Sequence, residues 1–165
     1  MSYSKSLKSA QHGNKLNMDK IIFRLARLKC DSKTVFEMFT VKEHLEKWLT
    51  TLADVEPRVG GKYELFWNPT DKENDSTIGC KILALQPSKF LCFEWKGPKK
   101  FKHFMNERRP LTNVVVFFES EESETQVYLF HNGWGDTEEW EEARQWFDKA
   151  WVNAFSELEK YVNKK

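Results

Sequence analysis

Two carboxylates are placed where acid–base chemistry would be possible, because each lies inside a strongly aromatic segment. Glu64 follows Tyr63, and Glu94 precedes Trp95. A carboxylate enclosed by aromatic rings has a raised pKa and can give or take a proton near neutral pH. The side chains of a strand alternate between its faces, however, so rings that point inward leave both carboxylates in solvent. We therefore expect Glu64 and Glu94 to be exposed, and we predict no catalytic residue in these segments.

The histidines and cysteines show no spacing that is typical of a metal site or an activated nucleophile. They are His12, His44, His103, His131, Cys30, Cys80 and Cys92. The chain has no Gly-x-Ser-x-Gly turn either. Cys92 and His131 could meet across a sheet, but we expect Cys92 to face away from the rings of its strand. The sequence thus predicts no metal, no cofactor and no catalytic set, and an enzyme is the less favoured interpretation.

Charge and length exclude some classes of function. The chain has 165 residues, with 26 basic and 25 acidic side chains. A net charge of +1 argues against a dedicated nucleic-acid-binding protein, which is typically basic. No apolar run is long enough to cross a bilayer, and isolated cysteines are typical of a reducing compartment. We expect a cytoplasmic protein with no nucleic-acid partner and no integral membrane association.

The first residues differ in composition from the rest of the chain. Residues 1–19 are rich in Ser, Lys, Gln and Asn and contain little that could be buried, so we predict a disordered tail. One folded domain is predicted over residues 20–163, which is long enough to bury a hydrophobic core.

The domain contains six segments with the alternation of strands, at 21–28, 61–67, 77–85, 90–95, 112–118 and 125–131. In the first, Ile21, Phe23 and Leu25 share one face. A glycine pair precedes the second and suits a bend, after which Tyr63 and Trp67 point to the same face. Because the connections between the later strands are short, we expect an antiparallel sheet.

Helices are predicted at two places. Two short helices follow the first strand, with Asp31 or Ser32 as the first N-cap. The chain closes with one long helix over about 137–162, capped by Asp136, with Glu139 completing a capping box. About 26 residues at ~1.5 Å each give a helix of roughly 39 Å, which is about the width of a small domain.

This order of elements favours an α+β fold. A curved antiparallel sheet of about six strands would wrap around the long C-terminal helix, with two short helices after the first strand. Where sheet and helix diverge, aromatic side chains can enclose a cavity.

Several motifs occur in an order that is typical of one protein family. They are Val35-Phe36, Glu43-His44-Leu45-Glu46-Lys47-Trp48, Val59-Gly60-Gly61-Lys62-Tyr63, Phe93-Glu94-Trp95, Gly133-Trp134, and Trp146 with Trp151. Over roughly Lys20 to Val162 the chain resembles the activator of heat-shock-ninety ATPase homologue-like family of the START-like (SRPBCC) superfamily. This resemblance implies a helix-grip fold with an apolar cavity between sheet and helix. Members of the superfamily include lipid and polyketide binders, cyclases, and a domain that stimulates the ATPase of the ninety-kilodalton heat-shock chaperone.

We expect the cavity to bind an apolar or amphipathic small molecule. The residues predicted to line it are Tyr63, Trp67, Trp95, Phe117, Leu129, Trp134, Phe147 and Trp151. The basic loop 96–110 could bind anions, membranes or bases, but its length favours a gate in which Phe101, His103 and Phe104 fold over the cavity mouth. The alternatives are a co-chaperone-like module that stimulates a partner ATPase and a cyclase-like enzyme. Monomer and dimer both remain open.

Overall fold

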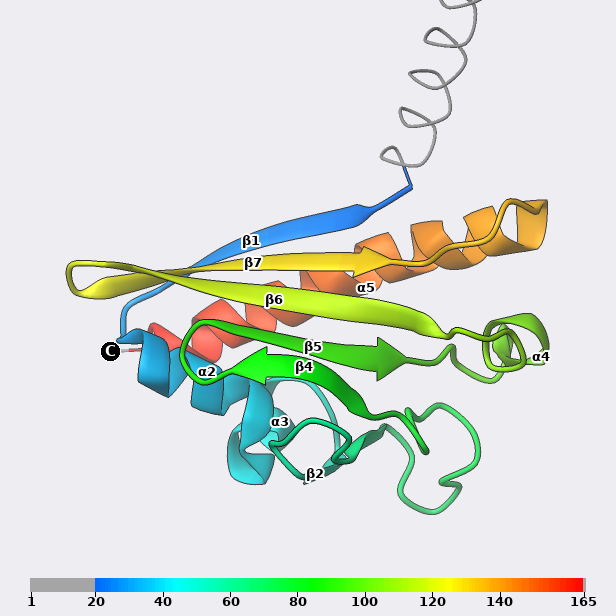
Figure 1. Cartoon of the computed structure of the whole chain (residues 1–165), viewed down its shortest axis with the longest axis horizontal. Coiled ribbons are helices and arrows are strands. Elements are labelled where there is room, and N and C mark those ends of the chain that lie inside the picture. Colours follow the sequence, from blue (N-terminus) through cyan, green and yellow to red (C-terminus); the bar gives the residue numbers. More distant parts are fainter. Residues whose placement is uncertain (1–19, 165) are drawn as a thin grey trace, which may run out of the picture.

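The computed structural model describes residues 20–164, so the predicted tail 1–19 lies outside the described residues. The fold is α+β, as predicted (Figure 1). Its elements are β1 (Ile22–Leu28), α2 (Ser32–Thr40), α3 (Lys42–Trp48), β2 (Leu52–Val55), β3 (Tyr63–Phe66), β4 (Ile82–Gln86), β5 (Phe90–Trp95), α4 (Lys102–Met105), β6 (Thr112–Glu121), β7 (Glu124–Asn132) and α5 (Glu138–Val162).

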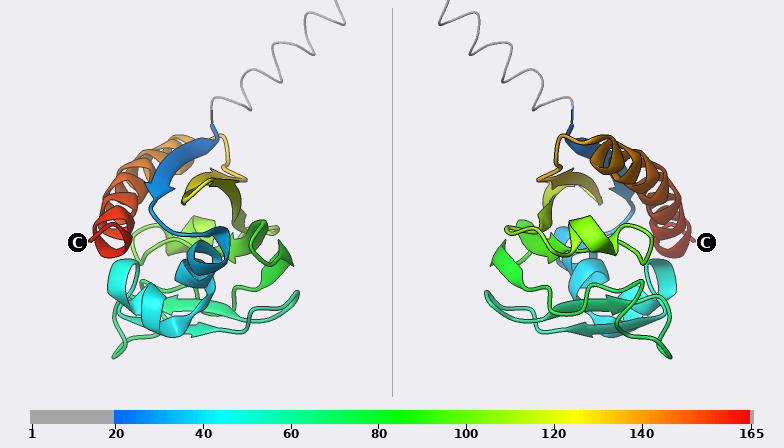
Figure 2. Two further views of the ribbon diagram at one scale, coloured as in Figure 1. Left: turned by 90° about the vertical axis from the view of Figure 1, so that its left-hand side faces the viewer. Right: turned by 90° about the vertical axis from the view of Figure 1, so that its right-hand side faces the viewer.

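The strands form two antiparallel sheets. One has five strands in the order β1-β7-β6-β5-β4, and the other pairs β2 with β3. Backbone hydrogen bonds join the two sheets, since the N–H of Gly60 donates to the carbonyl of Ile82 at 2.8 Å and that of Tyr63 to Cys80 at 2.9 Å. The strands therefore form one curved layer, in agreement with the predicted helix-grip architecture (Figure 2).

The glycine pair has the role in a bend that the sequence predicts. Gly60 has a φ of 79°, in the left-handed region that favours glycine. A Cβ on Gly61 would lie 2.3 Å from the carbonyl oxygen of Glu56, so the backbones approach too closely for any side chain. The bend lets the chain turn from β2 into β3.

Three elements, β2, β4 and α4, differ from the sequence-based expectations. The third predicted strand begins at Ile82 rather than at residue 77, because Thr77 serves the neighbouring sheet instead. Its hydroxyl donates to the carbonyl of Tyr63 at 2.9 Å and accepts from the N–H of Leu65 at 2.8 Å. The short strand β2 and the single-turn helix α4 were not predicted, since neither segment has a clear periodic pattern.

The short helix α2 is capped by Asp31, one of the two predicted residues, whose carboxylate accepts from the N–H of Thr34 at 2.8 Å. The cap of α5 is different from the prediction. Thr137 accepts from the N–H of Trp140 at 3.3 Å, while Asp136 pairs with Lys20. The cap is therefore one residue later than predicted, and Glu139 does not complete a capping box.

The three longer helices lie on one side of the five-stranded sheet (Figures 1 and 2). Phe118 of β6 packs edge-on against Phe36 of α2, with 5.8 Å between ring centroids. Arg24 of β1 donates to the carbonyl and the carboxylate of Asp148 in α5. We call this covered side the inner face and the opposite side the outer face.

One predicted cavity residue lies on the outer face instead of the inner face. In β6, Val114, Val116 and Phe118 are buried on the inner face, whereas Phe117 is 45% exposed on the outer face. The prediction for Phe117 was wrong because residues 114–118 are all apolar, so alternation of polarity could not identify the buried side. The face shared by Ile21, Phe23 and Leu25 is likewise the exposed one, as these side chains are 41%, 45% and 41% exposed.

Candidate functional site

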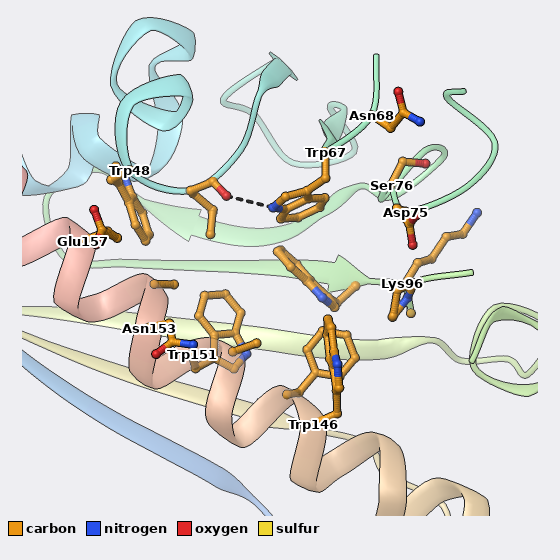
Figure 3. A pocket seen from close by; sticks show the side chains of 17 residues that line it. Trp48, Trp67, Asn68, Asp75, Ser76, Lys96, Trp146, Trp151, Asn153 and Glu157 are labelled. Atoms are coloured by element: carbon orange, nitrogen blue, oxygen red, sulfur yellow. Dashed lines mark hydrogen bonds between the residues drawn. The ribbon is translucent and has the colours of Figure 1, made fainter. Parts of the chain in front are cut away.

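A pocket of about 540 Å³ lies between α5, the C-terminal end of α3 and the segments that follow β3 and β5 (Figure 3). Most of its wall is aromatic or aliphatic, and the polar groups lie toward its ends. The aromatic lining consists of Trp48, Trp67, Trp95, Trp146, Phe147 and Trp151, and the polar lining of Asn68, Asp75, Ser76, Lys96, Asn153 and Glu157. Four of the residues predicted for the cavity, Trp67, Trp95, Phe147 and Trp151, line it.

The floor of the pocket is formed by two buried indoles. Trp95 of β5 and Trp151 of α5 are each 3% exposed, and their ring centroids are 5.2 Å apart. Trp67 meets Trp95 edge-on at 5.9 Å, so Trp95 stands between Trp67 and Trp151. On the two walls, Trp67 and Trp146 are each 39% exposed, which leaves large ring surfaces open to the pocket.

Three of these indoles use their only polar group inside the protein. The N–H of Trp48 donates to the carbonyl of Met38 at 2.8 Å, and that of Trp67 donates to the carbonyl of Leu49 at 2.9 Å. The N–H of Trp151 donates to His131. Because these donors are already satisfied, Trp48, Trp67 and Trp151 offer the pocket only apolar ring surface.

His131 fixes the position of Trp151 from within the core. It is fully buried, and its Nδ1 accepts from the Trp151 indole at 3.1 Å. The neutral ring then carries its proton on Nε2, which donates to the hydroxyl of Thr112 at 3.1 Å. Burial lowers the pKa of His131 to about 3, so the ring is uncharged at neutral pH. His131 is thus a structural partner of the pocket floor, although sequence reasoning gave it no role.

Three of the charged groups at the ends of the pocket already have partners in the protein. Lys96 donates to the carbonyl of Ile78 at 2.6 Å, and the carboxylate of Asp75 accepts from the N–H of Lys99 at 2.8 Å. At the other end Glu157 forms an exposed ion pair with Lys160 at 3.2 Å. A ligand would therefore meet an apolar middle and two polar, solvent-accessible ends (Figure 3).

The predicted gate residues lie beside the pocket and outside its lining. Phe101 is 4% exposed and packs edge-on against Trp146 at 6.0 Å. Phe104 packs against Trp140 at 5.1 Å, and His103 lies 3.5 Å from Glu139. These contacts attach the loop to the first half of α5, where it supports Trp146. The loop contributes Lys96, Gly97 and Pro98, at its start, to the pocket itself.

Three other predicted cavity residues belong to the packed core. Tyr63 is fully buried, its ring stacks on Phe93 at 3.9 Å, and its hydroxyl donates to the carbonyl of Phe39 at 2.8 Å. Leu129 is also fully buried, and the indole of Trp134 donates to the carbonyl of His131 at 3.0 Å. The predicted polar contact from Tyr63 was wrong, because its hydroxyl points to α2 rather than into the pocket.

The two carboxylates singled out by their aromatic neighbours face away from the core. Glu64 accepts from the backbone N–H of Gly79 at 2.7 Å, and Glu94 from that of Lys81 at 3.0 Å. Both are partly exposed, as strand alternation predicts. Cys92 is on the outer face as well, since it is three positions from the inward-pointing Trp95, and so it cannot meet His131.

The sequence reasoning missed Trp48, Trp146, Asp75 and Lys96 as pocket residues. Trp146 directly precedes Phe147 in α5. An indole outside the apolar stripe of this helix was the available signal, and the buried residues of that stripe are Trp140, Ala143, Phe147, Trp151, Phe155 and Leu158. Asp75 and Lys96 come from different loops, 21 residues apart in the chain, and no local pattern connects them.

Two further properties concern the described residues, 20–164. No group of three or more His, Cys, Asp or Glu side chains in this part of the chain is arranged to hold a metal ion. Within the same range, no helix combines the length and apolar character needed to span a bilayer.

The fold is shared with many solved structures. A protein from Mesorhizobium loti is 16% identical, with a TM-score of 0.69 over 88% of this chain and 98% of its own. The Aha1 dimer from Colwellia psychrerythraea is 18% identical, with a TM-score of 0.64 over 86% of this chain and 95% of its own. An Hsp90 activator from Plasmodium falciparum is 18% identical, with a TM-score of 0.65 over 86% and 94%. At these identities the likeness concerns the fold alone.

No curated protein matches the chain. The family model described as Activator of Hsp90 ATPase homolog 1-like protein matches residues 29–163, which is most of the chain and includes every residue that lines the pocket. This confirms the family that the sequence motifs predict. The chain belongs to the family of Activator of Hsp90 ATPase homolog 1-like proteins.

Proposed function

We propose that the protein binds an apolar or amphipathic small molecule in the pocket beside α5. The observation that supports this proposal most directly is the chemistry of the pocket wall. Its indoles expose ring surface to the pocket, while Trp48, Trp67 and Trp151 direct their N–H groups to partners in the protein. Because three of its indoles offer only ring surface, this wall favours a ligand whose central part is mainly apolar.

The size of the pocket is compatible with such a ligand. Its volume of about 540 Å³ falls within the range of roughly 300–1,000 Å³ that small-molecule sites occupy. Covering about 200 Å² of apolar surface would contribute ~5 kcal/mol at ~25 cal/mol per Å², before the entropic cost of association. We expect the two polar ends to hold the head of an amphipathic ligand in contact with water.

A substitution that fills the pocket tests this proposal. Ala150 lines the pocket, so Ala150→Trp should occupy the ligand volume without removing a buried contact. The matched control is Val152→Trp, at a side chain that is 51% exposed and outside the lining. The probe is decyl maltoside, used below its critical micelle concentration. Isothermal titration calorimetry measures its affinity for each variant. We expect Ala150→Trp to weaken binding at least about tenfold and the control to leave it unchanged.

Two outcomes would contradict small-molecule binding at this site. One is that decyl maltoside fails to bind and native mass spectrometry of the freshly purified protein detects no co-purified molecule. The other is that the probe binds equally well to the Ala150→Trp variant, which would place binding elsewhere on the protein.

We propose stimulation of a partner ATPase as the alternative function, because the chain belongs to a family named for its likeness to a homologue of the activator of the Hsp90 ATPase. The basic loop and the acidic start of α5 would form the contact surface, and His103 and Glu139 bring these two segments together. Phosphate release by a purified Hsp90-type chaperone should then rise when the protein is added. A rise that persists in a Lys99→Glu, Lys100→Glu variant would exclude this surface, and no rise at all would exclude the function.

We also propose the cytoplasm as the compartment in which either function operates. Cys30, Cys80 and Cys92 are free thiols in the structure, which is typical of proteins in reducing compartments.

A further inference from the structure

The outer face of the five-stranded sheet is apolar in a way that the pocket does not explain. Strands β1, β5, β6 and β7 all direct large apolar side chains outward, opposite to the side that carries the helices. We call this surface the outer-face patch, and its residues are Phe23, Leu25, Phe90, Phe117, Tyr128 and Phe130.

The rings of the outer-face patch form a continuous row across four neighbouring strands. Phe23 of β1 lies 5.2 Å from Phe130 of β7, and Phe130 lies 6.1 Å from Phe117 of β6. Phe117 in turn lies 6.3 Å from Phe90 of β5. Cross-strand pairs of this kind stabilise a sheet, but each ring still presents one side to solvent.

Exposure of such an apolar surface to solvent is unfavourable. Phe23 and Phe117 are each 45% exposed and Leu25 is 41% exposed. An antiparallel sheet with one free side normally shows polar residues there, and a large exposed apolar patch on a protein marks an interaction site. α2, α3 and α5 all lie on the opposite side of the sheet (Figure 2).

We propose that the outer-face patch is the interface between two copies of this chain. Its six side chains are uncharged, although 31% of all residues are charged, so the patch offers no complement to a strongly charged partner. A total net charge of +1 gives little long-range repulsion between copies. In a twofold dimer the same surface serves both partners, and a row of similar rings suits such self-complementary contact.

The size of the face sets the expected strength of the dimer. At ~4.8 Å between strands and ~3.4 Å per residue, four strands of about seven residues cover roughly 450 Å² in projection. The accessible area of an uneven surface is larger than its projection. The accessible area of this face therefore approaches the value of about 800 Å² per partner that is typical of a standard interface. The sheet curves across its strands (Figure 2), so we place the centre of contact on β6 and β7 and expect a dissociation constant of about 1 to 100 µM.

Sedimentation velocity of the full chain from about 1 to 300 µM tests this proposal, because that range spans the expected dissociation constant. We expect the wild-type protein to change from monomer to dimer over the series. The variant Phe117→Lys should weaken the dimer at least about tenfold, since it places a charge at the centre of the contact. The matched control is Val152→Lys, which replaces a 51% exposed side chain on α5 and should leave the dimer unchanged.

Three results would overturn the proposal. A wild-type chain that stays monomeric up to the highest concentration would assign the patch to a different protein. Equal dimerisation of wild type and Phe117→Lys would place the interface elsewhere, as would loss of the dimer in the Val152→Lys control. If Phe117→Lys loses its far-ultraviolet circular dichroism, Phe23→Lys at the margin of the patch replaces it, with the same comparison applied.

Discussion

The inner and outer faces of the five-stranded sheet are made from similar residues and have opposite environments. On the inner face Phe93 is 1% exposed and packs on Tyr63, while on the outer face Phe117 is 45% exposed beside Phe130. Both rings lie in central strands, and both have aromatic neighbours. The comparison shows that the covering helices, rather than the residue type, decide which side of this sheet becomes the core.

The inner face also contains the only histidine that the sheet buries among residues 20–164. His131 receives a hydrogen bond from Trp151 of α5 and packs against Phe147 with 5.3 Å between ring centroids. A buried polar ring with both nitrogens satisfied fixes the helix at one position along the sheet. Trp151 lines the pocket, so the inner face links the packing of the core to the shape of the candidate site.

Truncating one ring on each face gives the largest expected difference. Phe93→Ala should lower the free energy of unfolding by about 3–5 kcal/mol, since it leaves a cavity in the core. Phe117→Ala should cost about 1 kcal/mol or less, because half of that ring is already in solvent. Urea unfolding at a protein concentration below about 1 µM measures both values without a contribution from association. Equal losses would contradict the assignment of the two faces.

Protonation of His131 should distinguish the inner face by a pH dependence. The pKa of His131 is lowered from 6.5 to about 3 by burial, so the unfolded chain binds a proton at a higher pH than the folded one. Stability is therefore complete above the unfolded pKa of about 6.5 and falls as the pH drops toward 3. Between pH 7 and pH 5 this loss should be about 2 kcal/mol.

A pair of variants assigns that loss to the buried ring. His131→Gln should remove the pH dependence between pH 7 and 5, at the cost of lower stability at pH 7. His103→Gln, at a side chain that is 63% exposed, should leave the dependence as in the wild type. Urea midpoints at the two pH values measure both, and a wild-type slope in His131→Gln would show that another group is responsible.

The elements themselves could largely be predicted from local patterns. The strand 90–95 and the long final helix have the expected bounds within about one residue, because a clear alternation and a regular apolar stripe specify them. The sequence also predicts that Trp95 and Trp151 line the same cavity, since Trp95 points inward from a strand and Trp151 lies on the apolar stripe of α5. The curvature that separates helix and sheet followed from the glycine pair and from the family resemblance.

What could not be predicted depends on tertiary contacts. In β6 five successive apolar residues, 114–118, fit either face, so only the positions of α2 and α5 reveal that Phe117 points outward. Lys96 and Asp75 line the pocket because two loops converge there. Tyr63 does not line it, because its hydroxyl donates to the carbonyl of Phe39. None of these contact partners is near in the sequence. Secondary-structure propensity and hydrophobic periodicity therefore contain no information about these contacts.

The smallest expected effect compares two neighbouring residues of one strand. Val116 is fully buried on the inner face, and Val115 lies next to it on the outer face. Val116→Thr should lower the free energy of unfolding by about 1–2 kcal/mol, because it buries a hydroxyl among apolar side chains. Val115→Thr keeps the same shape and should stay within about 0.5 kcal/mol of the wild type, since water reaches its hydroxyl. Thermal unfolding of the two variants at equal, sub-micromolar concentration measures the difference. If Val115→Thr were the more destabilising of the two, the covered side of the sheet would be the one that carries Phe117, and both the pocket and the proposed dimer interface would have to be reassigned.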